Sequence, residues 1–214
     1  GQPVNDLTVI GDCDHSGTLI RFKADAEIFT ETTEYDWETL QKRMREQAFL
    51  NAGLSISLTD RRNETPETPA IAEKYCYEGG ISSFVEYMNK TRGYQVLHPD
   101  VIHLTVTEED TVAEVALQYN DSYNENILSF ANNIHTVDGG THETAFKTAI
   151  TRIFNDYGRR HSLLKEGDNS LKGDDVREGL TAVVSVKLKD AQFEGQTKAK
   201  LGNTSMGTLV NSLL

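Results

Sequence analysis

The feature that most constrains the fold is one long amphipathic helix predicted for residues 141–160. Its apolar residues recur at steps of one, three and four, so they fall on one face of a helix. They are Ala145, Phe146, Ala149, Ile150, Ile153, Phe154 and Tyr157. A stripe of this length must be buried against another element of the chain.

Three strand-like runs precede this helix and supply the surface that it needs. They are 101–107, 111–119 and 126–131, and a fourth run, 182–188, follows the helix. In the second run Ala113, Val115, Leu117 and Tyr119 alternate with other residues and share one side. With a last helix at 204–214, the order of elements predicts an α+β fold that has one face of its sheet covered.

The first part of the chain predicts shorter elements. Val9–Ile10 and Thr18–Phe22 favour short strands, and 36–50 favours an amphipathic helix that stops at Asn51-Ala52-Gly53. A half-buried strand is expected at 54–58.

A loop without apolar periodicity is expected at 61–76 because it is polar and carries two prolines. A short helix follows around 81–88.

Composition bounds the class of protein. A chain of 214 residues allows one large or two small domains. The formal net charge of −12 argues against a protein that coats DNA, since such proteins neutralise phosphates. The exception is 141–165, which holds five Lys or Arg residues against two acidic ones. If DNA contacts this chain, the long helix is the expected surface.

Cysteine usage and hydropathy predict a cytoplasmic protein. Cys13 and Cys76 are far apart and form no CxxC pair, so free thiols in a reducing compartment are expected. No apolar stretch approaches the ~20 residues that span a bilayer, and the start of the sequence shows no signal segment. We therefore expect no membrane partner.

The segment 190–203 is the strongest candidate for a functional loop. It places Gln196, Thr197 and Lys198 between glycines, just after a predicted strand. Lysine suits phosphate recognition because its ammonium is a compact point charge with three donors. A solvated surface lysine is the alternative for an isolated Gln-Thr-Lys triplet.

The sequence of this loop and four other blocks resemble the B subunits of DNA gyrase. The loop is Phe-Glu-Gly-Gln-Thr-Lys at 193–198, and the other blocks occupy 27–36, 45–51, 77–81 and 138–143 in the same order as in that family. The topoisomerase IV B protein, a close paralogue, remains the alternative. The segments 115–119 and 130–136 look more similar to gyrase.

The resemblance implies a fold and a domain division. Residues 77–214 would form a transducer domain similar to ribosomal S5 domain 2. Residues 1–76 would be the last strands and helix of a GHKL-type ATPase domain. The implied parent enzyme is an ATP-dependent type II topoisomerase that passes one DNA duplex through a cut in another. Its implied partners are the gyrase A subunit, a second B subunit, double-stranded DNA and ATP with Mg²⁺.

The resemblance also assigns roles to nucleotide-binding residues. Lys198, with Gln196, would contact the γ-phosphate of ATP, and Gly17-Thr18 would help to hold adenine through a hydroxyl that donates and accepts. The general-base glutamate, the Mg²⁺-binding asparagine and the glycine-rich lid of the family are not found in this sequence. The chain alone is therefore expected to lack ATPase activity and to bind no nucleotide tightly.

Arg152 and Arg159 lie seven residues apart on the polar side of the long helix. By resemblance, an arginine at the position of Arg152 would line a DNA-sized hole between two transducers. The alternative is a solvated helix face on which Arg152 pairs with Asp156, worth only ~0.3 to 0.5 kcal/mol.

Residues 138–143 have a structural explanation. Gly139-Gly140 would form a turn and Thr141 would cap the long helix. His142 has no second ligand at metal-binding spacing, so no metal site is predicted.

Two other classes of protein remain as alternatives. A non-enzymatic binding module of the S5 type would need no ATP. A chaperone or mismatch-repair ATPase would also place a basic residue over the γ-phosphate. The Gln-Thr-Lys loop and Gly17-Thr18 argue against the binding module. The blocks at 138–143 and 193–198 argue against the chaperone or mismatch-repair ATPase, since they are associated with topoisomerases.

Overall fold

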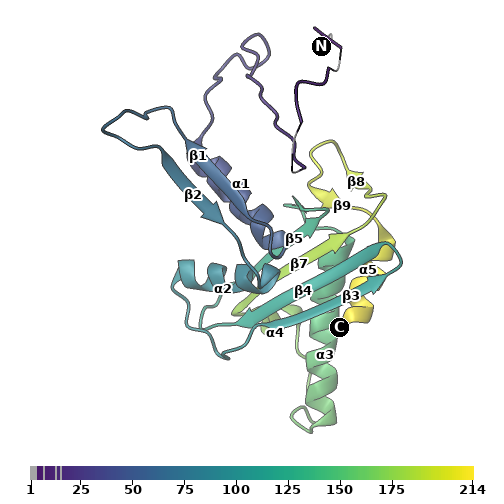
Figure 1. Cartoon of the computed structure of the whole chain (residues 1–214). Coiled ribbons are helices and arrows are strands. Elements are labelled where there is room, and N and C mark those ends of the chain that lie inside the picture. The colour runs from purple at the N-terminus through teal and green to yellow at the C-terminus, as the bar shows by residue number, and fades with distance from the viewer. Residues whose placement is uncertain (1–3, 7, 13, 15) are drawn as a thin grey trace. The chain divides into compact units, whose positions relative to one another are not determined.

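The computed structural model describes residues 4–6, 8–12, 14 and 16–214 (Figure 1). It divides into two compact units, 1–36 and 37–214, which are described separately. Cys13, one of the two cysteines expected to be free, lies outside the described residues, whereas Cys76 is exposed and free.

The first unit holds no helix and no strand among its described residues. The strands expected at Val9–Ile10 and Thr18–Phe22 are therefore wrong. The physical reason is that a strand needs a hydrogen-bonded neighbour, which the described residues of this unit do not supply. Its apolar side chains are accordingly exposed, as in Ile10 and Phe22, although Phe22 meets the ring of Tyr35 edge-on at 6.3 Å.

The second unit contains every helix and strand that the structure describes. The helices are α1 (Trp37–Leu50), α2 (Gly80–Arg92), α3 (Thr141–Arg160), α4 (Gly173–Arg177) and α5 (Thr204–Leu213). The strands are β1 (Ile56–Asp60), β2 (Ile71–Tyr75), β3 (Ile102–Glu108), β4 (Thr111–Tyr119), β5 (Asn126–Ala131), β6 (Ile134–His135), β7 (Leu180–Lys187), β8 (Phe193–Glu194) and β9 (Lys200–Leu201).

Five strands form the main sheet in the order β3-β4-β7-β5-β6. All neighbours are antiparallel except β5 and β7, which run parallel with Asn126 opposite Thr181 and Ala131 opposite Val186. The predicted α+β class is confirmed, and the predicted bounds of β4 and β5 match the structure.

One face of the sheet is covered by α3, α4 and α5. Phe146 and Ile150 of α3 pack with Leu209 of α5 against the sheet, as the apolar stripe predicted. Val115 and Val184 point to this side from neighbouring strands. The far end of α3 extends beyond the sheet in Figure 1, and Tyr157 near that end is exposed.

The other face is also covered, which corrects the expectation of one open face. Phe49 of α1 and Phe84 and Val85 of α2 pack against Val183 and Phe130. The reason lies in β7, whose residues are buried on both sides because it is the central strand. A nearly continuous apolar run is typical of such a strand.

A hairpin of β1 and β2 follows α1. The helix stops where predicted, with Gly53 in a left-handed conformation at φ 77°. The strand expected at 54–58 begins two residues later, and β2 forms inside the expected loop 61–76 because it pairs with β1. The domain boundary expected after residue 76 remains a prediction.

No helix in the described part of the chain is both long enough and apolar enough to cross a membrane.

Candidate functional site

Lys198 lies in a tight hairpin formed by β8 and β9. Phe193 pairs with Leu201, and Glu194 with Lys200, so five residues connect the strands. The N–H group of Lys198 donates to the carbonyl oxygen of Gly195 at 3.3 Å. Gly195 and Lys198 both have positive φ values, 78° and 56°. A left-handed lysine carries a strain of order 1 kcal/mol, which the hairpin must hold.

The two lysines of this hairpin differ in their electrostatic surroundings. The ammonium of Lys200 lies 3.2 Å from a carboxylate oxygen of Glu194. Lys198 has no ion pair within the described residues, and its ammonium lies 6.0 Å from the ring centroid of Phe193. Lys198 and Gln196 are exposed. Lys198 therefore offers its charge to an anion, while the charge of Lys200 is already compensated.

Asn203 fixes both ends of the segment that carries the hairpin. Its side-chain oxygen accepts from the N–H of Gln192 at 2.7 Å, and its amide donates to the carbonyl of Asp190 at 3.0 Å. Gly202 donates to the carbonyl of Gln192 at 2.8 Å. Three short bonds thus hold the base of the loop while its tip is exposed.

The same base is attached to the segment that begins α3. The backbone N–H of Asp138 donates to the carbonyl oxygen of Ala199 at 2.9 Å. The backbone N–H of Leu201 donates to the carbonyl oxygen of Gly139 at 3.1 Å. Gly140 has φ 145°, and a Cβ there would lie 2.5 Å from the carbonyl oxygen of Leu201. Only glycine allows this contact.

Thr141 does not cap α3, which corrects that prediction. The N-cap residue is Gly140, and the described structure shows no side-chain hydrogen bond at this cap. Thr141 instead donates its hydroxyl proton to the carbonyl of Asn203 at 2.6 Å. The hydroxyl is used to join α3 to the loop base, a partner that the local sequence does not reveal.

Gly17 and Thr18 belong to the first unit, where both are exposed in irregular chain. Their role toward adenine remains a prediction. The structure brings Gln196 and Lys198 into one loop, and it places Arg152 and Arg159 on one helix.

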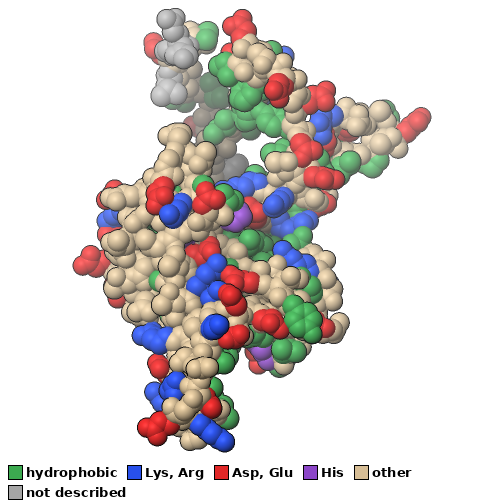
Figure 2. Space-filling view, turned by 180° about the vertical axis from the view of Figure 1, so that it is seen from behind, with side chains coloured by type: hydrophobic (Ala, Val, Ile, Leu, Met, Phe, Trp, Pro, Cys, Tyr) green, Lys and Arg blue, Asp and Glu red, His purple; other side chains and the backbone are tan. Residues whose placement is uncertain are grey.

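Arg152 and Arg159 are exposed on α3. Arg159 donates to the hydroxyl of Ser170 at 3.0 Å. Arg152 forms no ion pair within the described residues, so the expected alternative, pairing with Asp156, is not observed. Figure 2 shows Lys and Arg side chains along the projecting end of this helix, mixed with fewer acidic ones.

A groove of about 530 Å³ runs beside Arg152. Hydroxyl, amide and cationic groups line it: Thr144, Lys147, Thr148, Thr151, Arg152, Asn155, Gly173 and Arg177. Such groups are those that contact nucleic-acid phosphates and sugars.

Two cations that line the groove, Lys147 and Arg177, belong to a charge network that no sequence pattern indicated. Glu125 accepts from Lys147 at 2.8 Å and from Arg177 at 2.7 Å, and Lys147 also meets Glu143 at 2.9 Å. Burial works against charge on Lys147, but its two carboxylate partners raise its pKa above the usual value. These cations are compensated, which leaves Arg152 as the groove's cation without an ion pair among the described residues.

A buried polar cluster lies beneath the start of α3. Ser129 donates to Glu143 at 2.6 Å and contacts the hydroxyl of Thr136 at 2.7 Å, and the Nε2 atom of His142 lies 3.3 Å from that hydroxyl. Burial lowers the pKa of His142 to about 4, with Glu143 opposing the shift. The cluster could not be read from the sequence, because its members come from β5, α3 and the segment between them.

Among the described residues, no group of three or more His, Cys, Asp or Glu side chains is arranged to hold a metal ion.

Comparison with solved structures gives the same architecture. The 43K ATPase domain of Thermus thermophilus gyrase B, in complex with an aminocoumarin, aligns with 88% of this chain, and the aligned part is 48% of the gyrase chain. The two share 38% sequence identity, with a TM-score of 0.73. The ATP-binding domain of topoisomerase IV from Francisella tularensis matches 86% of the chain at a TM-score of 0.65. Its identity is 21%, so it shows the fold alone.

Sequence comparisons identify the family. The DNA gyrase B protein of Halalkalibacterium halodurans is 54% identical over the whole chain, and that of Bacillus mycoides is 50% identical. The chain spans about a third (32%) of the first relative and about half (51%) of the second. Residues 80–214 match the family model described as DNA gyrase B. The chain belongs to the DNA gyrase B family.

Proposed function

We propose that this chain couples the state of bound ATP to the movement of DNA within an ATP-dependent type II topoisomerase. One observation carries the proposal. Lys198 presents an ammonium without an ion pair among the described residues, from a left-handed position in a hairpin whose base is bonded to α3. The family membership supports the class of enzyme.

Lys198 acts in this proposal by electrostatic stabilisation. Its ammonium donates to the γ-phosphate of ATP, whose equatorial oxygens share the negative charge in the transition state, and the amide of Gln196 shares the contact. A fixed charge is effective because it needs no reorganisation during the reaction. The ring of Phe193 and the bonds of Asn203 limit the freedom of the loop that carries this charge.

The chain supplies a phosphate contact rather than a complete active site. We propose that Gly17 and Thr18 contact adenine, with the Thr18 hydroxyl donating and accepting hydrogen bonds. Neither Lys198 nor Thr18 is a suitable proton acceptor for the attacking water. The 214-residue chain alone is therefore expected to hydrolyse no ATP.

The basic side of α3 is the proposed DNA surface. Arg152 presents its charge at a groove lined with hydroxyls, and Arg159 lies seven residues further along the same helix. Phosphate contacts of this kind position DNA without reading its sequence. In this proposal the division into an ATPase part (1–76) and a transducer (77–214) stands. Gyrase A, a second copy of gyrase B and double-stranded DNA are the partners.

The test compares two lysines of one hairpin in the longer gyrase B protein. Lys198→Gln is expected to lower the ATPase rate on the order of 10² or more, as removal of one charge-stabilising donor does. Lys200→Gln is the matched control and should cost far less, because the charge of Lys200 is exposed and already paired with Glu194.

Nucleotide binding separates a γ-phosphate contact from general basicity. The affinity for ADP should hardly change in either variant, whereas Lys198→Gln should weaken a non-hydrolysable ATP analogue. Equal loss of ADP and analogue affinity, or equal rates for both variants, would refute the γ-phosphate role and favour a non-enzymatic module.

A further inference from the structure

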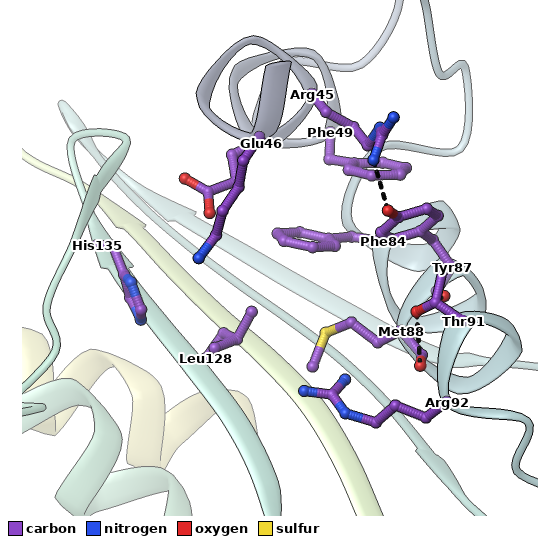
Figure 3. Close-up of a pocket in the computed structure, with 11 residues that line it drawn as sticks. Arg45, Glu46, Phe49, Phe84, Tyr87, Met88, Thr91, Arg92, Leu128 and His135 are labelled. Atoms are coloured by element: carbon purple, nitrogen blue, oxygen red, sulfur yellow. Dashed lines mark hydrogen bonds between the residues drawn. The ribbon is translucent and has the colours of Figure 1, made fainter. Parts of the chain in front are cut away.

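We propose that the cavity between α1, α2 and β5–β6 is a binding site for a small planar aromatic anion, such as a one- or two-ring carboxylate. This site lies in the second unit and is independent of the proposed role of Lys198. Its walls come from two helices and two strands that are distant in sequence (Figure 3).

The interior of the cavity is apolar and flat-sided. Phe49 and Phe84 stack with ring centroids 4.7 Å apart and an interplanar angle of 6°. Met88 and Leu128 continue the wall, and Figure 3 shows both between the Phe84 ring and Arg92. Because Tyr77 covers the other face of Phe49 at a centroid distance of 3.7 Å, a ligand ring would meet Phe49 edge-on and pack against the aliphatic groups.

The size of the cavity selects the class of ligand. Its volume is about 290 Å³, at the lower end of the ~300–1,000 Å³ that ligand pockets usually occupy. One or two fused rings fit in this space, whereas a complete nucleoside triphosphate does not.

Cations outnumber carboxylates in the lining of the cavity and select the charge of the ligand. Lys42, Arg45 and Arg92 all line the cavity, against one carboxylate, Glu46. Glu46 is compensated by Arg43 at 3.3 Å.

Only some of these cations have other partners. The guanidinium of Arg45 donates to the hydroxyl of Tyr87 at 2.6 Å, and it lies 3.8 Å from a carboxylate oxygen of Glu73. Within the described residues, Lys42 and Arg92 form no ion pair. The cavity therefore offers an anion two cations, Lys42 and Arg92, whose charges are not already paired among the described residues.

Arg92 has the geometry that the proposal needs. In Figure 3 its side chain reaches from the end of α2 toward Leu128, so the guanidinium lies along the apolar wall. A planar guanidinium can bind a carboxylate through two N–H donors and can also stack on a ring.

The opposite wall is an uncharged ring at neutral pH. His135 lies on β6 across from α2 and stacks on Phe130 at 5.1 Å. Burial lowers the pKa of His135, with Glu46 opposing the shift and Lys42 adding to it. The wall thus accepts an aromatic face without adding charge above about pH 7.

A ligand in this cavity would add contacts to the packing that already joins α1 and α2 to the sheet. It would contact α1, α2 and β5 together, so binding would stabilise the packing of α1 on the sheet. The expected consequence is a higher unfolding temperature that depends on ligand concentration.

The experiment uses two probes of equal shape on the 214-residue chain: naphthalene-2-carboxylate and the neutral naphthalene-2-carboxamide. NMR titration should show saturable binding of the carboxylate with Kd on the order of 10⁻⁴ M, and shifts at Phe84, Met88 and Leu128. The amide should bind roughly threefold to tenfold more weakly.

Two variants locate the charge contact. Arg92→Gln should weaken the binding of the carboxylate by a similar factor and leave the affinity for the amide unchanged. Lys90→Gln is the matched control, since it removes a charge from the same helix outside the cavity. Leu128→Trp should fill the cavity and abolish the binding of both probes.

The proposal is overturned by any of three results. One is the absence of saturable carboxylate binding at millimolar concentration. Another is equal affinity for the carboxylate and the amide. The third is equal weakening by Arg92→Gln and Lys90→Gln. If Leu128→Trp fails to fold, the Arg92 and Lys90 comparison still decides.

Discussion

The backbones of Gly140 and Leu201 lie in direct contact, with no room for a side chain at position 140. A Cβ there would lie 2.5 Å from the carbonyl oxygen of Leu201 and 2.7 Å from its nitrogen. This contact joins the start of α3 to the hairpin that carries Lys198. The contacts around it, and the buried and basic groups of α3, can each be tested by substitution.

Gly140→Ala should be strongly destabilising. The methyl group would clash with backbone atoms, and φ 145° is a conformation that only glycine adopts without strain. We expect a loss of more than about 3 kcal/mol in the free energy of unfolding, measured by urea denaturation. Gly167→Ala is the control, because a Cβ there meets nothing within 4 Å. It should change stability by less than about 1 kcal/mol. Similar losses in both variants would show that the close contact is not rigid.

Asn203→Ala should loosen the base of the hairpin. The variant removes the acceptor of the Gln192 N–H group and the donor to Asp190. Hydrogen exchange at the Gln192 amide should accelerate roughly tenfold, the equivalent of one lost hydrogen bond. Exchange in the central strand, at Val184, should not change. Asn211→Ala, an exposed position on α5, is the matched control, and protection of Gln192 that survives Asn203→Ala would contradict the role of Asn203.

Stability should rise with pH between pH 4 and pH 6.5 because of His142. Its folded pKa is about 4 and its ordinary value is 6.5, so the unfolded chain binds more protons in this window. The contribution is present above pH 6.5 and is lost as the pH falls toward 4. From pH 7 to pH 5 the loss should be about 2 kcal/mol.

The variant His142→Gln should remove this part of the pH dependence, measured by urea unfolding at both pH values. His161→Gln, which changes an exposed histidine at the far end of the same helix, should keep it. An unchanged slope in His142→Gln would mean that other groups cause the pH dependence.

Arg152→Gln in the longer gyrase B protein should weaken DNA binding through the loss of one phosphate contact. The slope of log K against log salt should decrease in magnitude by about 1. Arg61→Gln removes another exposed charge far along the chain, beside Glu64, and should leave the slope unchanged. DNA-stimulated ATP hydrolysis provides a second measurement. If both rate and slope equal those of the unmodified protein, Arg152 is an ordinary surface arginine.

The long, periodic elements were predictable from sequence. The stripe of α3 and the alternation of β4 identified their buried faces, because each period belongs to one type of element. The short strands β6, β8 and β9 were missed, since a strand of two residues shows no period. The five-residue strand β2 was missed because it is defined by its pairing with β1, which the local sequence does not show. The expected strands near Val9 and Thr18 show the converse, because strand propensity does not supply a partner strand.

The candidate site was proposed only through family resemblance. No local rule separates Lys198 from Lys200, which lie in the same hairpin. The structure separates them through Glu194, a residue that pairs across the hairpin with Lys200. Similarly, no sequence pattern near Gly140 or Thr141 predicts that Leu201 and Asn203 are their partners, because those contacts join distant segments of the chain.

Because the hairpin is bonded to the first residues of α3, a small rotation at that end would produce a larger displacement at the other end of the helix. Arg159 lies 18 residues beyond Thr141, which is about 27 Å along a helix that rises 1.5 Å per residue. A tilt of about 10° at the end held by Gly140 and Leu201 would move the Arg159 end by roughly 5 Å. A displacement too small to break the hairpin contacts would therefore be large at the other end of the helix, comparable to one helical turn.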